Sequence, residues 1–149
     1  MEHRELGRKL AALRRAVNGW QALADEPTTG LTLVQIDGIQ NGLLQKFEYC
    51  WEMNWKTIRK YLLDIQGENV NLAKESIKKL FLLHKISEQQ FEILEKAQKD
   101  RNAMSHIYDS DAFNEIIARL PQYLTVFQEI LTILEEEYEN LTPLSSSPS

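Results

Sequence analysis

Apolar side chains recur every three or four positions along most of the chain, and no stretch alternates apolar and polar residues as a half-buried strand does. A first run covers residues 2–24 and stops at the polar and proline-containing segment that begins at Asp25. Its periodic apolar positions are Leu6, Leu10, Leu13, Val17 and Trp20. This spacing predicts an amphipathic helix with one buried face.

A second, longer helix is predicted to start at Thr32 and to end at Gly67. Thr32 and Gln35 have the spacing of a capping box, in which each side chain accepts a hydrogen bond from the other residue's backbone amide. Gly67 suits a left-handed helix cap, because glycine adopts that conformation without steric cost. Between these ends lies an apolar stripe made of Leu44, Phe47, Trp51, Trp55, Ile58, Leu62 and Ile65.

Two shorter helices are predicted next. The third covers about residues 71–85 and places His84 on the same face as Ile77, Leu80 and Phe81, so we interpret His84 as a packing or interface histidine. The fourth begins with a second capping box at Ser87 and Gln90.

A fifth helix is predicted to begin near residues 109–111, and Pro121 is expected to kink or split it. The chain of 149 residues therefore reads as an all-α, up-down bundle of about five helices. We expect residues 1–140 to form a single domain and residues 141–149, which are rich in serine and proline, to form a disordered tail.

Composition narrows the classes of function. A formal net charge of −5 argues against a surface that is basic all over, so any contact with a nucleic acid has to be local. The single cysteine excludes an intramolecular disulfide and a cysteine-based zinc cluster, which is typical of a reducing compartment. With no apolar run as long as a membrane span or a secretory signal, we expect a cytoplasmic protein without membrane contact.

The segment "RNAMSHIYD", residues 101–109, carries the candidate chemistry. Arg101 supplies a permanently charged guanidinium for a phosphate, Asn102 an amide that can orient it, and His106 an imidazole suited to proton transfer near neutrality. Such groups can support transesterification of RNA by its own 2′-hydroxyl. No Gly-rich phosphate loop and no Glu-x-x-His metal motif occurs, so we expect neither a metal nor a cofactor.

A structural interpretation of the same segment remains open. Arginine can pair with a carboxylate, and asparagine and histidine are favoured near a helix C-terminus. At about 100° per residue, Arg101 and His106 would also point about 140° apart on one helix. They can meet if the helix ends near His106, if the arginine bends around, or if a symmetric partner supplies its own copy.

The motif resembles that of a known superfamily. "RNAMSH" is similar to the HEPN pattern of arginine, a polar residue, three variable residues and histidine, and "RNAMSHIY" resembles the toxins paired with minimal nucleotidyltransferases. Upstream, "LLQKFEYCWEMNWKTIRKYL" looks like the long second helix of the same proteins, once described as nucleotidyltransferase substrate-binding proteins. The resemblance spans about residues 31–134.

This resemblance implies a helical homodimer whose two motifs face each other across a cleft and cleave RNA without a metal. Arg101 would stabilise charge on the phosphate, Asn102 would position the site, and His106 would act as general base or acid. Tyr108 matches the tyrosine that a cognate nucleotidyltransferase antitoxin modifies with AMP. A non-catalytic substrate- or nucleotide-binding subunit of a nucleotidyltransferase complex is the alternative, and a helical scaffold with an inert motif is a third possibility.

Several lysines are candidates for contact with RNA. Lys74, Lys78 and Lys85, together with Lys56, Arg59 and Lys60, could form a local positive surface. A solvated helix face is the competing interpretation. Glu52, one helical turn before Lys56, already gives that lysine a structural partner.

Overall fold

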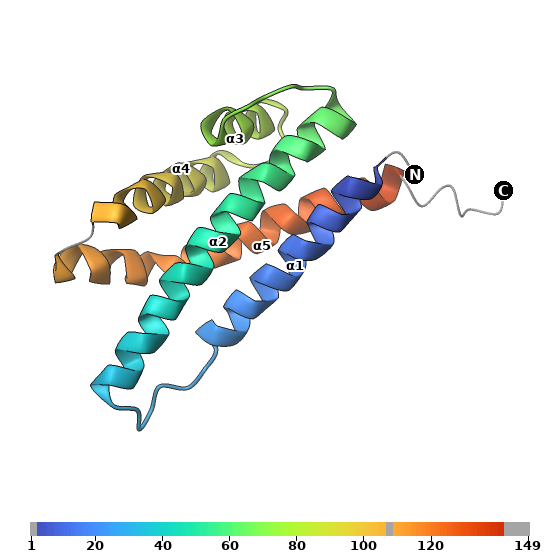
Figure 1. Cartoon of the computed structure of the whole chain (residues 1–149). Coiled ribbons are helices and arrows are strands. Elements are labelled where there is room, and N and C mark those ends of the chain that lie inside the picture. The colour runs from blue at the N-terminus through green and yellow to red at the C-terminus, as the bar shows by residue number, and fades with distance from the viewer. Residues whose placement is uncertain (1–2, 107–108, 142–149) are drawn as a thin grey trace.

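Five α-helices and one short 3₁₀ turn make up the computed structural model, which describes residues 3–106 and 109–141 (Figure 1). The helices are α1 (Arg4–Ala24), α2 (Leu33–Gln66), α3 (Ala73–Leu82), α4 (Glu88–Ala103) and α5 (Ser110–Leu141), and the 3₁₀ turn covers Met104–His106. No strand occurs within these described ranges, which confirms the predicted all-α bundle. α5 includes Leu141, the first residue of the expected tail, and residues 142–149 lie outside the described part of the chain.

Local signals determine where the helices begin and end. Both predicted capping boxes are present: Gln35 N donates to Thr32 Oγ1 at 3.1 Å and Thr32 N to Gln35 Oε1 at 2.9 Å, and the Ser87–Gln90 pair repeats these two bonds. Gly67 ends α2 with a φ of 70°. These three predictions from the sequence are confirmed.

The long helices α1, α2 and α5 pack along one another, and α3 and α4 form a shorter pair beside α2 and α5 (Figure 1). Aromatic rings fill the centre of the bundle. Phe47 and Tyr123 stack with ring centroids 5.4 Å apart, and Trp20 meets Phe127 edge to face at 5.6 Å. Such pairs add about 0.5–1.5 kcal/mol beyond the burial of their surface, so this cluster helps to hold the three long helices together.

The third helix is shorter than its periodicity predicts, and His84 does not pack on its apolar face. α3 ends at Leu82, and His84 lies in the left-handed region with a φ of 61° and is exposed to solvent. His84 N donates to Phe81 O and Lys85 N to Leu80 O, the bond pattern of a Schellman cap, which normally has glycine at this position. This cap turns the chain, so His84 leaves the apolar face that its spacing suggested.

Pro121 does not split α5, which continues through it as one helix. Its side chain is exposed, while the neighbouring Leu120 and Leu124 are buried against the core. The packing on both sides of the proline therefore holds the helix together despite the missing backbone donor. None of the described helices is long and apolar enough to cross a membrane.

Candidate functional site at the end of α4

The candidate motif lies where α4 tightens from an α-helix into the 3₁₀ turn, at the end that faces the start of α5 (Figure 1). A 3₁₀ turn advances by about 120° per residue. With about 100° per residue as far as Ala103 and about 120° per residue from there to His106, ideal helix geometry sets the two side chains about 160° apart. On this geometry, ending the α-helix before His106 is not expected to bring arginine and histidine to one side.

Arg101 is held against α2. Its Nη2 lies 3.3 Å from Glu52 Oε2, and its side chain is 34% exposed. The other oxygen of the same carboxylate, Glu52 Oε1, lies 3.6 Å from Lys56 Nζ, as the spacing of Glu52 and Lys56 predicted. Arg101 Nε is buried and has no hydrogen-bond partner among the described residues. The arginine thus has the carboxylate partner that the structural interpretation expected, while its Nε donor has no acceptor among the described residues.

The other motif residues face solvent. Asn102, Ser105 and His106 are all exposed. Tyr108 lies outside the described residues. A molecule approaching the end of α4 would therefore meet the amide and the imidazole first, and the partly covered guanidinium beside α2.

Asp100 is the residue that the sequence analysis missed. It is 5% exposed and accepts two hydrogen bonds from Arg119, Nε to Oδ2 at 2.7 Å and Nη2 to Oδ1 at 2.9 Å. The Tyr123 hydroxyl also donates to Asp100 Oδ2, at 2.5 Å. Burial, and then this hydrogen bond to Asp100, raise the pKa of the Tyr123 phenol well above its ordinary value. The three side chains fix the rotation of the last turn of α4, which directs the next residue, Arg101, toward α2.

The lysines proposed to contact RNA have different surroundings. Lys74 and Lys78 are exposed on α3 and line a groove of about 210 Å³ beside the stacked rings of Phe81 and Phe91. Lys85 lies beyond the end of α3, with its Nζ 3.0 Å from Glu137 Oε2 of α5. The structure therefore keeps Lys74 and Lys78 together and gives Lys85 a structural partner.

The basic residues of α2 lie on a different side, next to α1. Lys60 pairs with Glu5 at 3.2 Å and with Asp64 at 3.3 Å, and the hydrogen bond that Lys60 donates to Glu5 is the main reason that the pKa of Lys60 is raised. Lys56 and Arg59 are exposed. Within the described ranges, no three His, Cys, Asp or Glu side chains are grouped so that they could hold a metal ion.

The chain matches a known protein family over most of its length. The family model described as "nucleotidyltransferase substrate binding protein like" matches residues 4–136. A search of curated proteins found no significant match.

Several solved structures share the fold. A double mutant of the toxin–antitoxin MntA-HpeT superposes with a TM-score of 0.70 at 13% identity, over 88% of this chain and 97% of that one. A tri-AMPylated HEPN toxin of Shewanella oneidensis, in complex with its MNT antitoxin, gives 0.67 at 15% identity, with coverages of 88% and 96%. A protein of Thermus thermophilus gives 0.72 at 22% identity, with coverages of 82% and 98%. At these identities the likeness shows the fold alone.

Proposed function

This chain belongs to the nucleotidyltransferase substrate-binding-like family, and from that premise we propose that it is a ribonuclease toxin neutralised by a cognate minimal nucleotidyltransferase. The observation that carries the proposal is the end of α4, where the buried Asp100 is bound to Arg119 of α5, Arg101 contacts Glu52 of α2, and Asn102 and His106 are exposed. The fold shared with HEPN toxins supports it.

The proposed reaction is transesterification within an RNA strand. The 2′-oxygen attacks the adjacent phosphorus, the bond from phosphorus to the 5′-oxygen breaks, and a 2′,3′-cyclic phosphate forms. His106 takes the proton from the 2′-hydroxyl or gives one to the leaving 5′-oxygen. Arg101 neutralises the charge that builds up on the phosphate, and Asn102 holds a phosphate oxygen.

Two chains are proposed to complete the site. Because ideal helix geometry sets Arg101 and His106 of one chain about 160° apart, the arginine of one subunit and the histidine of another could face the same phosphate more easily than the pair in one subunit. A homodimer whose two α4 ends meet would also supply two histidines, one as base and one as acid. Crosslinking or light scattering that found only monomers in the active preparation would contradict this step.

AMP transfer to Tyr108 is the proposed switch. The phenol oxygen attacks the α-phosphorus of ATP, pyrophosphate leaves, and the phenol proton goes to solvent. The adduct would add negative charge and bulk two residues from His106, where the RNA phosphate has to bind. Intact-mass analysis with the partner enzyme and ATP should show gains of whole AMP units that are lost in Tyr108→Phe; equal gains in that variant would place the adduct elsewhere.

Cleavage is tested on the purified protein with single-stranded RNA in the presence of a chelator. We expect His106→Ala to abolish cleavage and Arg101→Ala to reduce it by about 10²-fold or more. His84→Ala is the matched control, because His84 is also exposed and lies outside the motif. Cleavage that persists in His106→Ala, or that falls equally in His84→Ala, would remove His106 from the mechanism.

A non-catalytic substrate- or nucleotide-binding subunit is the second candidate. The ion pair between Arg101 and Glu52 favours it, because a guanidinium already neutralised by a carboxylate is a weaker phosphate ligand. This candidate predicts binding to a nucleotidyltransferase and no RNA cleavage by the free protein. The cleavage assay above separates the two.

A further inference from the structure

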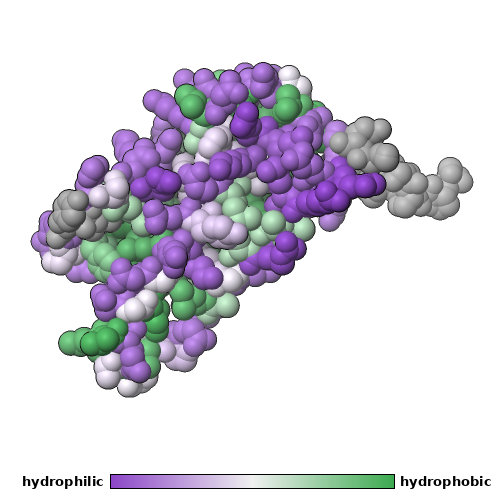
Figure 2. All heavy atoms as spheres, viewed as in Figure 1, coloured by the Kyte–Doolittle hydropathy of each residue, from purple (hydrophilic) through white to green (hydrophobic). Residues whose placement is uncertain are grey.

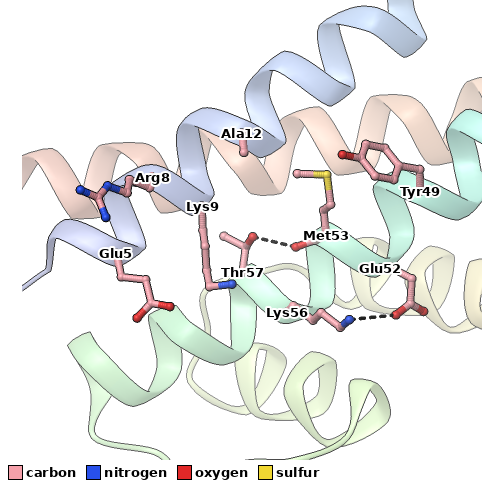
Figure 3. A pocket seen from close by; sticks show the side chains of 9 residues that line it. All are labelled: Glu5, Arg8, Lys9, Ala12, Tyr49, Glu52, Met53, Lys56 and Thr57. Atoms are coloured by element: carbon pink, nitrogen blue, oxygen red, sulfur yellow. Dashed lines mark hydrogen bonds and ion pairs between the residues drawn. The ribbon is translucent and has the colours of Figure 1, made fainter.

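A groove of about 400 Å³ runs between α1 and α2 (Figure 3), and one of its lining residues, Glu52, contacts Arg101 of the motif. One wall carries Arg8 and Lys9 from α1, and the other carries Tyr49, Glu52 and Lys56 from α2. Its volume is within the range of pockets that hold small ligands of nucleotide size.

Uncompensated positive charge is the first property of this groove. Neither Arg8 nor Lys9 has a carboxylate within ion-pair distance among the described residues, in contrast to Lys60 and Lys85. A second hollow, next to the groove, shares Glu5, Lys9 and Lys56 with it. The residues that line the two together include five basic and two acidic side chains, namely Arg8, Lys9, Lys56, Arg59, Lys60, Glu5 and Glu52. Lys56 pairs with Glu52 and Lys60 with Glu5, so the cations without a carboxylate among the described residues are Arg8, Lys9 and Arg59. On a chain with a net charge of −5, this is a local cationic strip.

An apolar floor with an aromatic ring is the second property. Met53 and Ala12 lie between the charged walls, and Tyr49 is 60% exposed although it is a large aromatic residue (Figure 3). In Figure 2, pale green apolar atoms are likewise flanked by purple polar ones where α1 and α2 run side by side. Bases of single-stranded nucleic acids stack on such rings while lysine and arginine neutralise the backbone.

Glu52 joins this groove to the motif. Its carboxylate lines the groove and at the same time contacts Arg101 Nη2 at 3.3 Å and Lys56 Nζ at 3.6 Å. The cationic strip therefore continues from Lys9 through Lys56 to Arg101. A phosphate that displaced Glu52 would lie between Lys56 and Arg101, and the strand on one side of it would follow the groove.

We propose that the groove between α1 and α2 binds the nucleotides of single-stranded RNA that lie next to the cleaved bond, with Tyr49 stacking on a base and Arg8, Lys9 and Lys56 contacting phosphates. This inference rests on the proposed ribonuclease function and adds the path that the RNA strand takes along the protein surface. The groove of Lys74 and Lys78 is the weaker candidate, because its rings of Phe81 and Phe91 stack on each other, 4.8 Å apart, and both are partly buried.

Binding is measured on the full chain with a 2′-O-methylated single-stranded RNA of about 12 nucleotides, which cannot be cleaved because the attacking hydroxyl is blocked. Arg8→Glu with Lys9→Glu should weaken affinity by about tenfold or more. It should also reduce the slope of log affinity against log salt by about 0.7 for each lost phosphate contact. Lys74→Glu with Lys78→Glu changes the net charge equally and tests the competing lysine surface on α3, so a larger loss of affinity there than in Arg8→Glu with Lys9→Glu would overturn the groove assignment. Equal losses in the two double variants would overturn the groove assignment.

Tyr49 supplies a test that does not change charge. Tyr49→Ala should weaken binding by about fivefold or more, and Tyr49→Phe should retain it, because stacking needs the ring and not the hydroxyl. An unchanged affinity in Tyr49→Ala would overturn the stacking role. ATP serves as the probe for a free nucleotide: ATP that bound in the groove while the RNA did not would overturn the assignment to a strand.

The same preparations distinguish the failure of this inference from failure of the proposed function. If RNA binding depends on the groove but unmodified RNA is not cleaved, the proposed ribonuclease activity is refuted and the groove is still an RNA-binding site. If Arg8→Glu with Lys9→Glu cleaves RNA as well as the unmodified protein does, the chain is a ribonuclease but the groove does not bind its substrate.

Discussion

Replacing Asp100 by alanine is expected to be the most damaging single polar change at the end of α4. The carboxylate is almost fully buried and accepts three hydrogen bonds from two residues of α5, Arg119 and Tyr123. Its loss leaves a guanidinium without its counter-charge and a buried phenol without its acceptor. The cost of leaving Arg119 and Tyr123 unpaired therefore adds to the loss of the three hydrogen bonds.

The magnitude follows from the burial of each partner. Breaking a buried ion pair from one side costs about 3–5 kcal/mol, but the Arg119 side chain is 29% exposed and can regain water, so its share is smaller. Tyr123 is fully buried, and an unsatisfied buried hydroxyl costs about 1–3 kcal/mol. We therefore expect Asp100→Ala to lower the free energy of unfolding by about 2–4 kcal/mol, or roughly 5–15 °C in Tm for a domain of this size.

Urea unfolding followed by circular dichroism measures this change. Asp37→Ala is the control, because Asp37 is an exposed carboxylate on α2 and should change stability by less than about 0.5 kcal/mol. A double-mutant cycle with Tyr123→Phe should show coupling of about 0.5–3 kcal/mol, since both changes remove the same bond. A loss below about 1 kcal/mol for Asp100→Ala, or simple additivity in the cycle, would refute the reasoning.

The other predictions concern helix ends and pH. His84→Gly should raise the free energy of unfolding by about 1 kcal/mol, because glycine adopts the left-handed cap of α3 more readily, and Gly67→Ala should lower it by a similar amount at the end of α2; thermal unfolding of both variants checks the opposite signs. Burial raises the pKa of the Cys50 thiol from 9.0 to about 12, and burial also raises the pKa values of the Tyr61 and Tyr123 phenols. The folded state then holds more protons than the unfolded state above pH 9, so stability should be full below that pH and should fall as pH rises toward 12. Urea midpoints that stay level between about pH 9 and 11 would contradict this.

Most of the fold could be predicted because its signals are local. Thr32 with Gln35, Ser87 with Gln90, and Gly67 determine helix ends through bonds within a few residues of each other. The third and fifth helices depend on tertiary packing as well. His84 takes a backbone conformation that its residue type disfavours, because the chain has to turn there, and α5 tolerates a proline because its neighbours are buried.

The motif itself could be located from sequence, but its surroundings could not. The order of Arg101, Asn102 and His106 is visible in the chain, whereas the contact of Arg101 with Glu52 joins residues on two different helices. Helical periodicity gives the relative angles of side chains along one helix and says nothing about which carboxylate of another helix lies opposite. The same limit applies to the groove, since Lys9 and Lys56 meet only when α1 and α2 pack.

Asp100 could not be recognised as a buried residue because its neighbours in the sequence are also polar. In "QKDRNA" it reads as one polar residue among several at a solvated helix end. The available signal lay on the partner helix, where Tyr123 and Arg119 are one turn apart on the apolar face of α5. A tyrosine on a buried stripe needs an acceptor for its hydroxyl, and an arginine beside it makes that acceptor a carboxylate. These two residues together indicate a carboxylate on a neighbouring helix, and because Asp100 precedes Arg101, this core contact also sets the direction of the motif.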